Sequence, residues 1–311
     1  MKVLIELPTW LGDSVMVTPA INNLTTFLQN SEISLIGSKI SIEIFLNHPQ
    51  VVESHVLDSN YINLYKFVRN LGNFDAFISF RSSYRSKFIK FLVISKNKFQ
   101  FSSNLYKKGH QVEKYNRFIN DSFNINVLPS KLQIYSQYKI KNNKTKLLGI
   151  SPGATYGSAK RWYPEQYAAV AIELSTKYDI IILGGNTEID IAGDIEKHLK
   201  NKGIKNFKNL VAKTSIQELI MQISNLDLFI TADSGPMHIA AAYKIPTVAI
   251  FGPTKEEETS QWMNEKGIVV KKNLKCQPCM QRTCPLMHHE CMRLIKSKDV
   301  LRAIEKLSLE F

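Results

Sequence analysis

Glycine and proline are few in this chain, with 14 and 11 among 311 residues, while 44% of the residues are hydrophobic. This composition excludes collagen-like, low-complexity and disordered proteins, because enough apolar material is present to offset chain entropy. Long hydrophobic runs are also missing. The most apolar stretches, residues 179–184 and 246–252, are far shorter than the roughly 20 residues that a bilayer-spanning helix needs. We therefore expect a globular protein with one large domain or, in better agreement with the usual size of domains, two domains.

A secretory signal is not visible at the start of the chain. Glu6 and Pro8 stand where the apolar core of such a signal would run, and no plausible cleavage site follows. We therefore expect a cytoplasmic protein.

Acidic residues are in deficit, since 27 Asp and Glu face 40 Lys and Arg, which gives a formal net charge of +13. Residues 76–112 and 122–164 contain no acidic residue but many cations. One interpretation is that most of these lysines lie on solvated faces. The alternative is a positive face for nucleic acid, an anionic lipid surface or a glycan.

Apolar runs and helix-periodic stretches alternate along the chain. In the first half they predict strands at 2–7, 33–36, 51–57 and 74–80, and helices at 40–46, 62–71 and 84–91. After the first strand we expect a turn and then a helix reaching about residue 28, capped by Asp13 or Ser14. In the second half they predict strands at 146–151, 179–183, 226–231 and 247–251, and helices at 165–177, 189–200, 216–223, 235–243 and 299–307.

This alternation predicts an α/β protein with two Rossmann-like domains that face a central cleft. The helical periodicity stops near residues 126–146, and the polar run at 139–144 resembles an exposed linker. We place the domains at 1–143 and 144–311.

Three loops that follow predicted strands in the second half favour nucleotide binding, because small residues and helix N-termini suit phosphate groups. For Glu188 the alternatives are binding ribose hydroxyls and capping the next helix. For Asp233 and Ser234 they are a place beside a diphosphate and the capping of the helix that follows. His238 touches a phosphate or is simply buried. The candidate donor-binding residues are Gly153, Thr155, Tyr156, Lys160, Arg161, Gly184, Glu188, Asp233, Ser234, Gly235 and His238. Walker A, G-x-G-x-x-G and G-x-S-x-G sequences are all missing, which argues against P-loop hydrolysis, the usual dinucleotide site and a nucleophile elbow.

Five motifs follow one another along the chain: Gly12-Asp13, Pro152-Gly153-Ala154, Lys160-Arg161-Trp162, the run at 233–241, and Phe251-Gly252-Pro253-Thr254. Together and in this order they resemble the ADP-heptose:lipopolysaccharide heptosyltransferases, which are inverting glycosyltransferases of the GT-B fold in glycosyltransferase family 9. The resemblance covers essentially the whole chain. Residues 8–16 are more similar to the second heptosyltransferases than to the first.

The resemblance implies roles for particular residues. The first domain would bind the inner-core acceptor, Kdo-lipid A bearing a first heptose, and the second would bind ADP-heptose. Asp13 matches the family's general base, which takes the proton of the acceptor hydroxyl, and Lys160 matches its phosphate-contacting lysine. Asp233, Ser234 and Gly235 match the loop at the diphosphate.

The resemblance also implies chemistry without a cofactor, and the sequence has no obvious D-x-D metal motif. The acceptor carries carboxylates and phosphates, so the basic first half would bind it and dock on the anionic inner-membrane surface from the cytoplasmic side. Gly12, Arg81, Arg85 and Lys87 are our candidates for acceptor contacts.

Cysteines are also few, and all four lie within residues 276–291: Cys276, Cys279, Cys284 and Cys291. Clustered cysteines in a cytoplasmic protein favour a metal over disulfides, although the spacing matches a zinc knuckle only in part. A structural zinc site and four reduced thiols both remain open.

Two other functions compete with the favoured one. A GT-B transferase could use a different nucleotide-sugar donor, because residues that read the sugar vary more freely than phosphate loops. A polyanion-binding module with a zinc knuckle would explain the charge and the cysteines, but it leaves the three loops and Asp13 without a purpose. Nucleic acid is not expected as a partner, since no recognisable motif accompanies the lysines.

Overall fold

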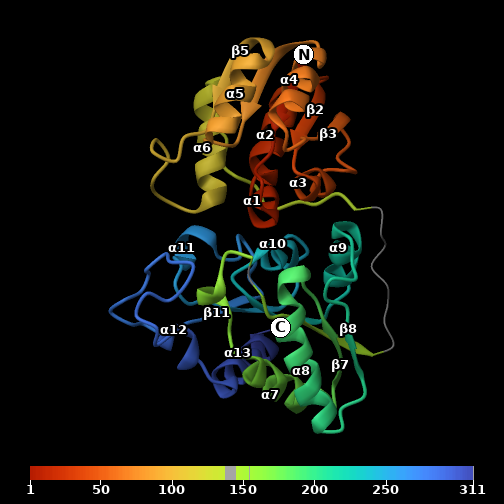
Figure 1. Ribbon diagram of the computed structural model, residues 1–311, viewed down its shortest axis with the longest axis vertical. Helices are drawn as coiled ribbons and strands as arrows, with labels where there is room; N and C mark the ends of the chain where they lie inside the picture. Colours follow the sequence, from red (N-terminus) through yellow and green to blue (C-terminus); the bar gives the residue numbers. More distant parts are fainter. Residues whose placement is uncertain (137–144, 154, 311) are drawn as a thin grey trace. The chain divides into compact units, whose positions relative to one another are not determined.

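The computed structural model describes residues 1–136, 145–153 and 155–310, and the chain folds into two compact units, Met1–Gln137 and Tyr138–Phe311 (Figure 1). The predicted linker at 139–144 and Ala154 lie outside the described residues.

Strands and helices alternate through the first unit. They are β1 (Lys2–Glu6), α1 (Leu11–Met16), α2 (Thr18–Phe27), β2 (Glu32–Gly37), α3 (Lys39–Ile44), β3 (Val51–Val56), α4 (Tyr61–Asn70), β4 (Asn73–Ser79), α5 (Tyr84–Leu92), β5 (Ile94–Gln100) and α6 (Gln111–Phe123). The strands form a parallel sheet in the order β3-β2-β1-β4-β5. The order reverses between β1 and β4, and ligands of open α/β sheets bind at the carboxyl ends of strands beside such a reversal.

The prediction that Asp13 or Ser14 caps a single long helix is wrong. The helix already begins at Leu11, so both residues lie inside α1, and the buried Ser14 hydroxyl donates to the carbonyl of Trp10 at 2.9 Å. The helix also ends at Met16. A second helix, α2, then starts with Pro19 in its first turn, where the missing N–H of proline costs no hydrogen bond.

Side-chain caps fix the beginnings of the other long helices in this unit. Asn60 accepts from the backbone of Ile62 at the start of α4, and Ser83 accepts from that of Ser86 at the start of α5. At the start of α6, Glu113 accepts from the backbone N–H of His110 at 2.7 Å, as part of a capping box. These polar residues therefore set where each helix leaves its loop.

The second unit repeats the alternation. Its elements are β6 (Lys146–Ser151), η1 (Ser158–Lys160), α7 (Pro164–Leu174), β7 (Tyr178–Ile182), η2 (Asn186–Glu188), α8 (Ile189–Asn201), β8 (Phe207–Asn209), α9 (Ile216–Ser224), β9 (Leu228–Ala232), α10 (Gly235–Ala242), β10 (Thr247–Ile250), α11 (Glu256–Thr259), β11 (Gly267–Val270), α12 (Glu290–Arg293) and α13 (Ser297–Glu310). Its parallel sheet has the order β11-β10-β9-β6-β7-β8, and the order reverses between β6 and β9. This is the Rossmann arrangement that the sequence predicts.

A buried core anchors the loop after β6 in the second unit. Trp162, two residues beyond Lys160, is 1% exposed, and its indole N–H donates to the carbonyl of Ile295 at 3.0 Å. Its ring also packs edge-on against buried Tyr167. The loop that carries Lys160 therefore ends at a fixed point in the core.

Candidate active site

The order reversal of the second sheet brings Lys160 and Asp233 together. Lys160 comes from η1 after β6, and Asp233 directly follows β9, so both lie at the carboxyl ends of neighbouring strands. The Lys160 Nζ lies 2.5 Å from Asp233 Oδ2, with the two side chains only 12% and 4% exposed. The same oxygen accepts from the hydroxyl of Thr254 at 2.6 Å. This cation is therefore held in place by a buried carboxylate.

Tyr156 packs beside this ion pair. Lys160 Nζ lies 4.7 Å from the centre of its ring, and the guanidinium of Arg282 lies 5.5 Å from it. The Tyr156 hydroxyl donates to the carbonyl of Met280 at 2.6 Å. Two cations over one aromatic ring make this region attractive for anions.

Asp233 and Ser234 precede α10, whose first turn also contains Gly235. Ser234 is the N-cap residue, yet among the described residues no side chain caps this helix, because Asp233 turns to Lys160 and Thr254 instead. The capping alternative is therefore wrong here. His238 lies inside α10 and is 3% exposed, which makes it a buried histidine.

Glu188 closes a second cluster beside Gly153. Its carboxylate accepts from the backbone N–H of Gly185 at 2.8 Å and lies 4.0 Å from the guanidinium of Arg161. A Cβ at Gly153 would stand 1.8 Å from Cγ of Glu188, so only glycine fits there. The neighbouring Gly184 is close to the same side chain, while Thr155 is exposed. The carboxylate of Glu188 thus completes the capping box of η2, but it makes no side-chain cap at α8, the helix that the sequence analysis expected it to cap.

Asp13 occupies the corresponding edge of the first unit. It is half-buried in the first turn of α1, and the hydroxyl of Tyr115 on α6 donates to its Oδ1 at 3.1 Å. Burial, together with the charge of Asp13, raises the pKa of Tyr115 well above its usual range, so the phenol stays a neutral donor. Tyr115 therefore positions the carboxylate of Asp13 through a hydrogen bond while its own hydroxyl stays protonated.

The predicted acceptor residues lie near this edge in different settings. Arg81, after β4, is 3.5 Å from the buried carboxylate of Glu6, the last residue of β1. Burial raises the pKa of Glu6, although hydrogen bonds from Ser79 and Ser86 work in the opposite direction. Gly12 adjoins Asp13 in α1 and is partly buried.

Arg85 and Lys87 lie on α5. Arg85 donates to the backbone carbonyls of Ser59 and Asp58, while exposed Lys87 lies 5.2 Å from the centre of the Tyr84 ring. These contacts hold Arg85 to the loop after β3 and leave Lys87 at the surface.

Sequence reasoning missed three of these contributors. Thr254 could have been found, because it ends a motif that carries the family resemblance and follows β10. Arg282 and Tyr115 gave no signal, since each reaches its partner from a distant segment: Tyr115 is 102 positions from Asp13.

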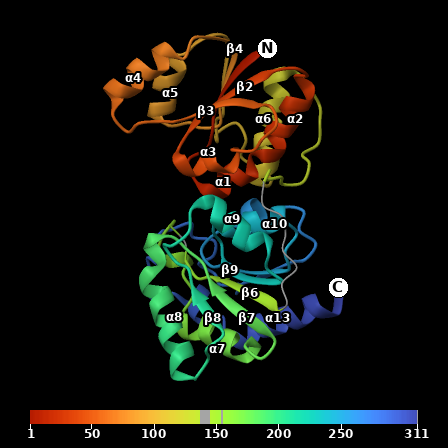
Figure 2. The same cartoon turned by 90° about the vertical axis from the view of Figure 1, so that its right-hand side faces the viewer.

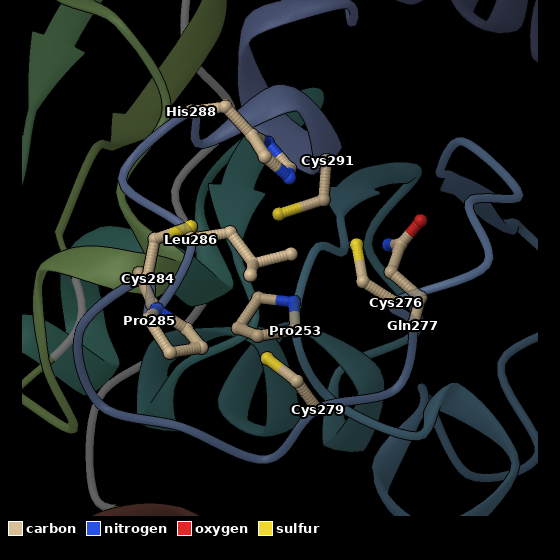
Figure 3. Close-up of a pocket in the computed structure, with 10 residues that line it drawn as sticks. Pro253, Cys276, Gln277, Cys279, Cys284, Pro285, Leu286, His288 and Cys291 are labelled. Atoms are coloured by element: carbon tan, nitrogen blue, oxygen red, sulfur yellow. The ribbon is translucent and has the colours of Figure 1, made fainter.

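The four cysteines and His288 line one small cavity of about 20 Å³ (Figure 3). Burial, and then the neighbouring thiols, raise the pKa of Cys291 to about 11. All four cysteines are free thiols. Within the described ranges, no three His, Cys, Asp or Glu side chains are grouped so that they could hold a metal ion.

The cysteine-rich segment also braces the loops around Lys160. The carbonyl of Arg282 accepts from the backbone N–H of Ala159 at 3.0 Å, and His289 Nε2 lies 3.0 Å from the carbonyl of Ala159. The amide of Gln277 donates to the carbonyl of Gly252 at 2.5 Å. The segment therefore supports both the Lys160 loop and the strand end before Thr254.

Comparison with known proteins gives consistent matches. The model of "Glycosyltransferase family 9 (heptosyltransferase)" matches residues 73–289. The chain is 43% identical over 319 aligned positions to lipooligosaccharide heptosyltransferase 2 of Campylobacter jejuni subsp. jejuni, with 99% of each chain covered.

Two solved structures share the fold. The structure of Escherichia coli ADP-heptose lps heptosyltransferase II has a TM-score of 0.82 at 20% identity, covering 100% of this chain and 99% of that one. Escherichia coli heptosyltransferase WaaC with ADP has a TM-score of 0.81 at 14% identity, covering 99% and 100%. These similarities confirm the predicted GT-B class.

Among the helices of the described residues, none is long and apolar enough to span a bilayer.

Proposed function

The chain belongs to glycosyltransferase family 9 and is a heptosyltransferase of lipopolysaccharide or lipooligosaccharide core synthesis, and we propose that its donor is ADP-heptose. The observation that carries this proposal is the buried Lys160–Asp233 pair at the order reversal of the second sheet. The backbone N–H groups at the start of α10 follow directly. A cation beside a helix N-terminus suits a diphosphate.

The leaving ADP gains negative charge as its bond to the anomeric carbon breaks, and Lys160 stabilises that charge. Asp233 keeps the ammonium group at the strand ends, so little reorganisation is needed when the diphosphate arrives. Gly153, Thr155, Tyr156, Arg161, Gly184 and Glu188 form the rest of the donor site in this proposal, and His238 is left out because it is buried in α10. No cofactor takes part in the step, because the side chains and the helix terminus supply the positive charge.

Asp13 acts as the general base on the acceptor side. It takes the proton of the acceptor hydroxyl while the oxygen attacks the anomeric carbon from the face opposite ADP, which inverts the configuration in one step. The phenol of Tyr115 holds the carboxylate in place. The first unit then binds the acceptor, with Gly12, Arg81, Arg85 and Lys87 near its carboxylates and phosphates.

This assignment places the acceptor, Kdo-lipid A bearing a first heptose, at the cytoplasmic face of the inner membrane. The enzyme would work there as a peripheral protein. The net charge of +13 supports attraction to the anionic lipid and to the charged inner core.

A calorimetric titration with ADP, GDP and UDP tests the donor, using Lys160→Met beside the wild type. We expect selective ADP binding that weakens at least about tenfold in the variant. Lys200→Met is the matched control, because Lys200 forms an exposed ion pair with Glu196 at 2.7 Å. Preference for UDP or GDP would keep the fold and replace the donor. Salt-sensitive binding of RNA with no nucleotide response would favour the polyanion-binding module instead.

A structural zinc at Cys276, Cys279, Cys284 and Cys291 is a separate proposal, supported by the shared cavity. As they stand in the described residues, these side chains are not grouped to hold an ion, so zinc plays no part in the mechanism above. Metal analysis of protein purified under reducing conditions tests it. One zinc per chain would support the proposal, and metal-free folded protein would favour the alternative of four reduced thiols.

A further inference from the structure

Helices α4 and α5 each bury one stripe and expose another. Leu64 and Val68 on α4, and Ile89 on α5, lie in the same hydrophobic core cluster of the first unit. The opposite stripes carry large apolar side chains in solvent, with Tyr84 88% exposed and Phe91 80% exposed. The exposed apolar residues, here termed the α4–α5 face, are Tyr61, Ile62, Tyr65, Tyr84 and Phe91.

The two exposed stripes belong to one surface. Helices α4 and α5 pack side by side, and the pair α2 and α6 lies in another part of the same unit (Figure 2). The ring of Tyr61 on α4 lies 5.7 Å from that of Phe88 on α5, and the guanidinium of Arg85 lies 5.7 Å from the centre of the Tyr61 ring. Because both helices bury their other stripe in the same core cluster, their exposed stripes point away from the sheet together.

The charged residues of α4 and α5 themselves are all of one sign. Helices α4 and α5 contain five cations, Lys66, Arg69, Arg85, Lys87 and Lys90, and neither Asp nor Glu. Helix α6 of the same unit differs, because its sequence has two acidic residues beside two cations, and its exposed positions include both Arg117 and Asp121. Exposed aromatic rings on helices whose own charges are all positive therefore distinguish α4 and α5 from an ordinary solvated helix. A nearby acidic group is Asp58, which precedes α4 and accepts from the side-chain amide of Asn63 at 2.7 Å.

We propose that the α4–α5 face docks the enzyme on an anionic phospholipid surface. Tyrosine and phenylalanine rings settle at the level of the lipid headgroups, where their apolar bodies leave water. Lys66 and Arg69 are exposed beside them and meet the anionic phosphates. Arg85 and Lys87 lie on the same helix as Tyr84 and Phe91, so docking brings a lipid-anchored acceptor to them. This last clause rests on the proposed function.

Sedimentation of the full-length protein with vesicles tests the proposal. The vesicles are phosphatidylcholine alone, or phosphatidylcholine with about 30% phosphatidylglycerol as the anionic lipid. We expect wild type to bind the anionic vesicles, and Tyr65→Ser/Phe91→Ser to lower its partition coefficient at least about tenfold. Lys66→Glu/Arg69→Glu should lower it by a similar factor and abolish the preference for phosphatidylglycerol.

Leu105→Ser/Leu128→Ser is the matched control, because Leu105 and Leu128 are 77% and 85% exposed in other parts of the same unit. The control should bind vesicles like wild type. Circular dichroism and ADP binding of every variant confirm that the protein is folded.

Three results would overturn the proposal. The variants could bind anionic vesicles as wild type does, or the control pair could lose as much binding. Alternatively, the same variants could change a monomer–dimer equilibrium or RNA binding in the absence of lipid, which would assign the face to another partner. Failure of heptose transfer to a delipidated acceptor would contradict the proposed function alone, since vesicle binding does not depend on heptose transfer.

Discussion

The first five strands of each unit follow the same order in their sheet, and the second unit adds a sixth strand at one edge. The two units nevertheless hold their charged groups in different ways. At the order reversal of the second sheet, Lys160 and Asp233 pair in a nearly buried position. At that of the first sheet, the carboxylate of Asp13 accepts a hydrogen bond from a buried, neutral phenol. One scaffold thus positions a cation through an ion pair and a base through a neutral donor. The difference suits their proposed tasks, since the cation must meet an anion and the base must take a proton.

Replacing the base should have the largest effect. In Asp13→Asn the side chain keeps its shape but cannot accept a proton, so we expect kcat to fall by about 10²- to 10⁴-fold. The affinity for ADP should stay unchanged, because the second unit carries the donor site in our proposal. Steady-state kinetics and calorimetry measure the two quantities.

Asp121→Asn is the matched control for that variant. Asp121 accepts from the hydroxyl of Tyr106 at 2.8 Å, a contact of the same kind on the same helix as Tyr115. Its activity should be close to that of wild type. If Asp13→Asn keeps most of its turnover, Asp13 is not the base.

Breaking the ion pair tests the other half of the comparison. Lys160→Met leaves Asp233 buried without its cation, so we expect the free energy of unfolding to fall by about 3 kcal/mol. Adding Asp233→Asn should restore most of that stability without restoring transfer activity, because the cation is still missing. Denaturant unfolding and kinetics separate the two effects. Equal recovery of both would make the pair purely structural.

Acid should weaken the first unit through His48. Burial lowers the pKa of His48 to about 4 from its usual 6.5, so the folded state binds fewer protons than the unfolded state between these values. Stability is therefore lost as the pH falls, by about 2 kcal/mol at pH 5. His48→Gln should flatten this dependence in pH-dependent unfolding, while ADP binding stays as in wild type. An unchanged pH profile would contradict the assignment to His48.

Removing the phenol should have the smallest effect. Tyr115→Phe deletes the hydrogen bond to Asp13 Oδ1 but leaves the ring packing, so we expect kcat to fall about tenfold or less. The acidic limb of the pH–rate profile should also move to higher pH, because the carboxylate has lost a donor. Tyr106→Phe, which removes the matched contact to Asp121, should leave the profile in place. A lower kcat with an unmoved profile would assign Tyr115 a packing role only.

The fold class and most buried elements could be predicted from the sequence, because strands covered on both faces are continuous apolar runs. The strands that the sequence analysis omits, β5, β8 and β11, all lie at sheet edges. In β5, Ser95, Lys96 and Asn97 interrupt the apolar pattern, since an edge strand is half exposed and tolerates polar residues. Helix α6 was also omitted, and with it Tyr115.

The site was predictable only in part. Asp13, Lys160 and Asp233 could be identified from motifs that follow strands, and their roles stay predictions. The pairing of Lys160 with Asp233 could not be predicted, because it joins residues 73 positions apart. Local capping rules also failed at Asp13 and Asp233, since each side chain has a partner across the fold, Tyr115 and Lys160. They failed at Ser14 because the helix begins earlier, and its hydroxyl donates to the carbonyl of Trp10 one turn back.

The close approach of Gly153 and Glu188 has an evolutionary consequence. A methyl group at position 153 would overlap the side chain at 188, so any larger residue at 153 requires Glu188 to move or to be replaced by a shorter residue. Among related sequences, the two positions should vary together, with a larger residue at 153 accompanied by a shorter one at 188. A designer who wishes to enlarge residue 153 should therefore change Gly153 and Glu188 together.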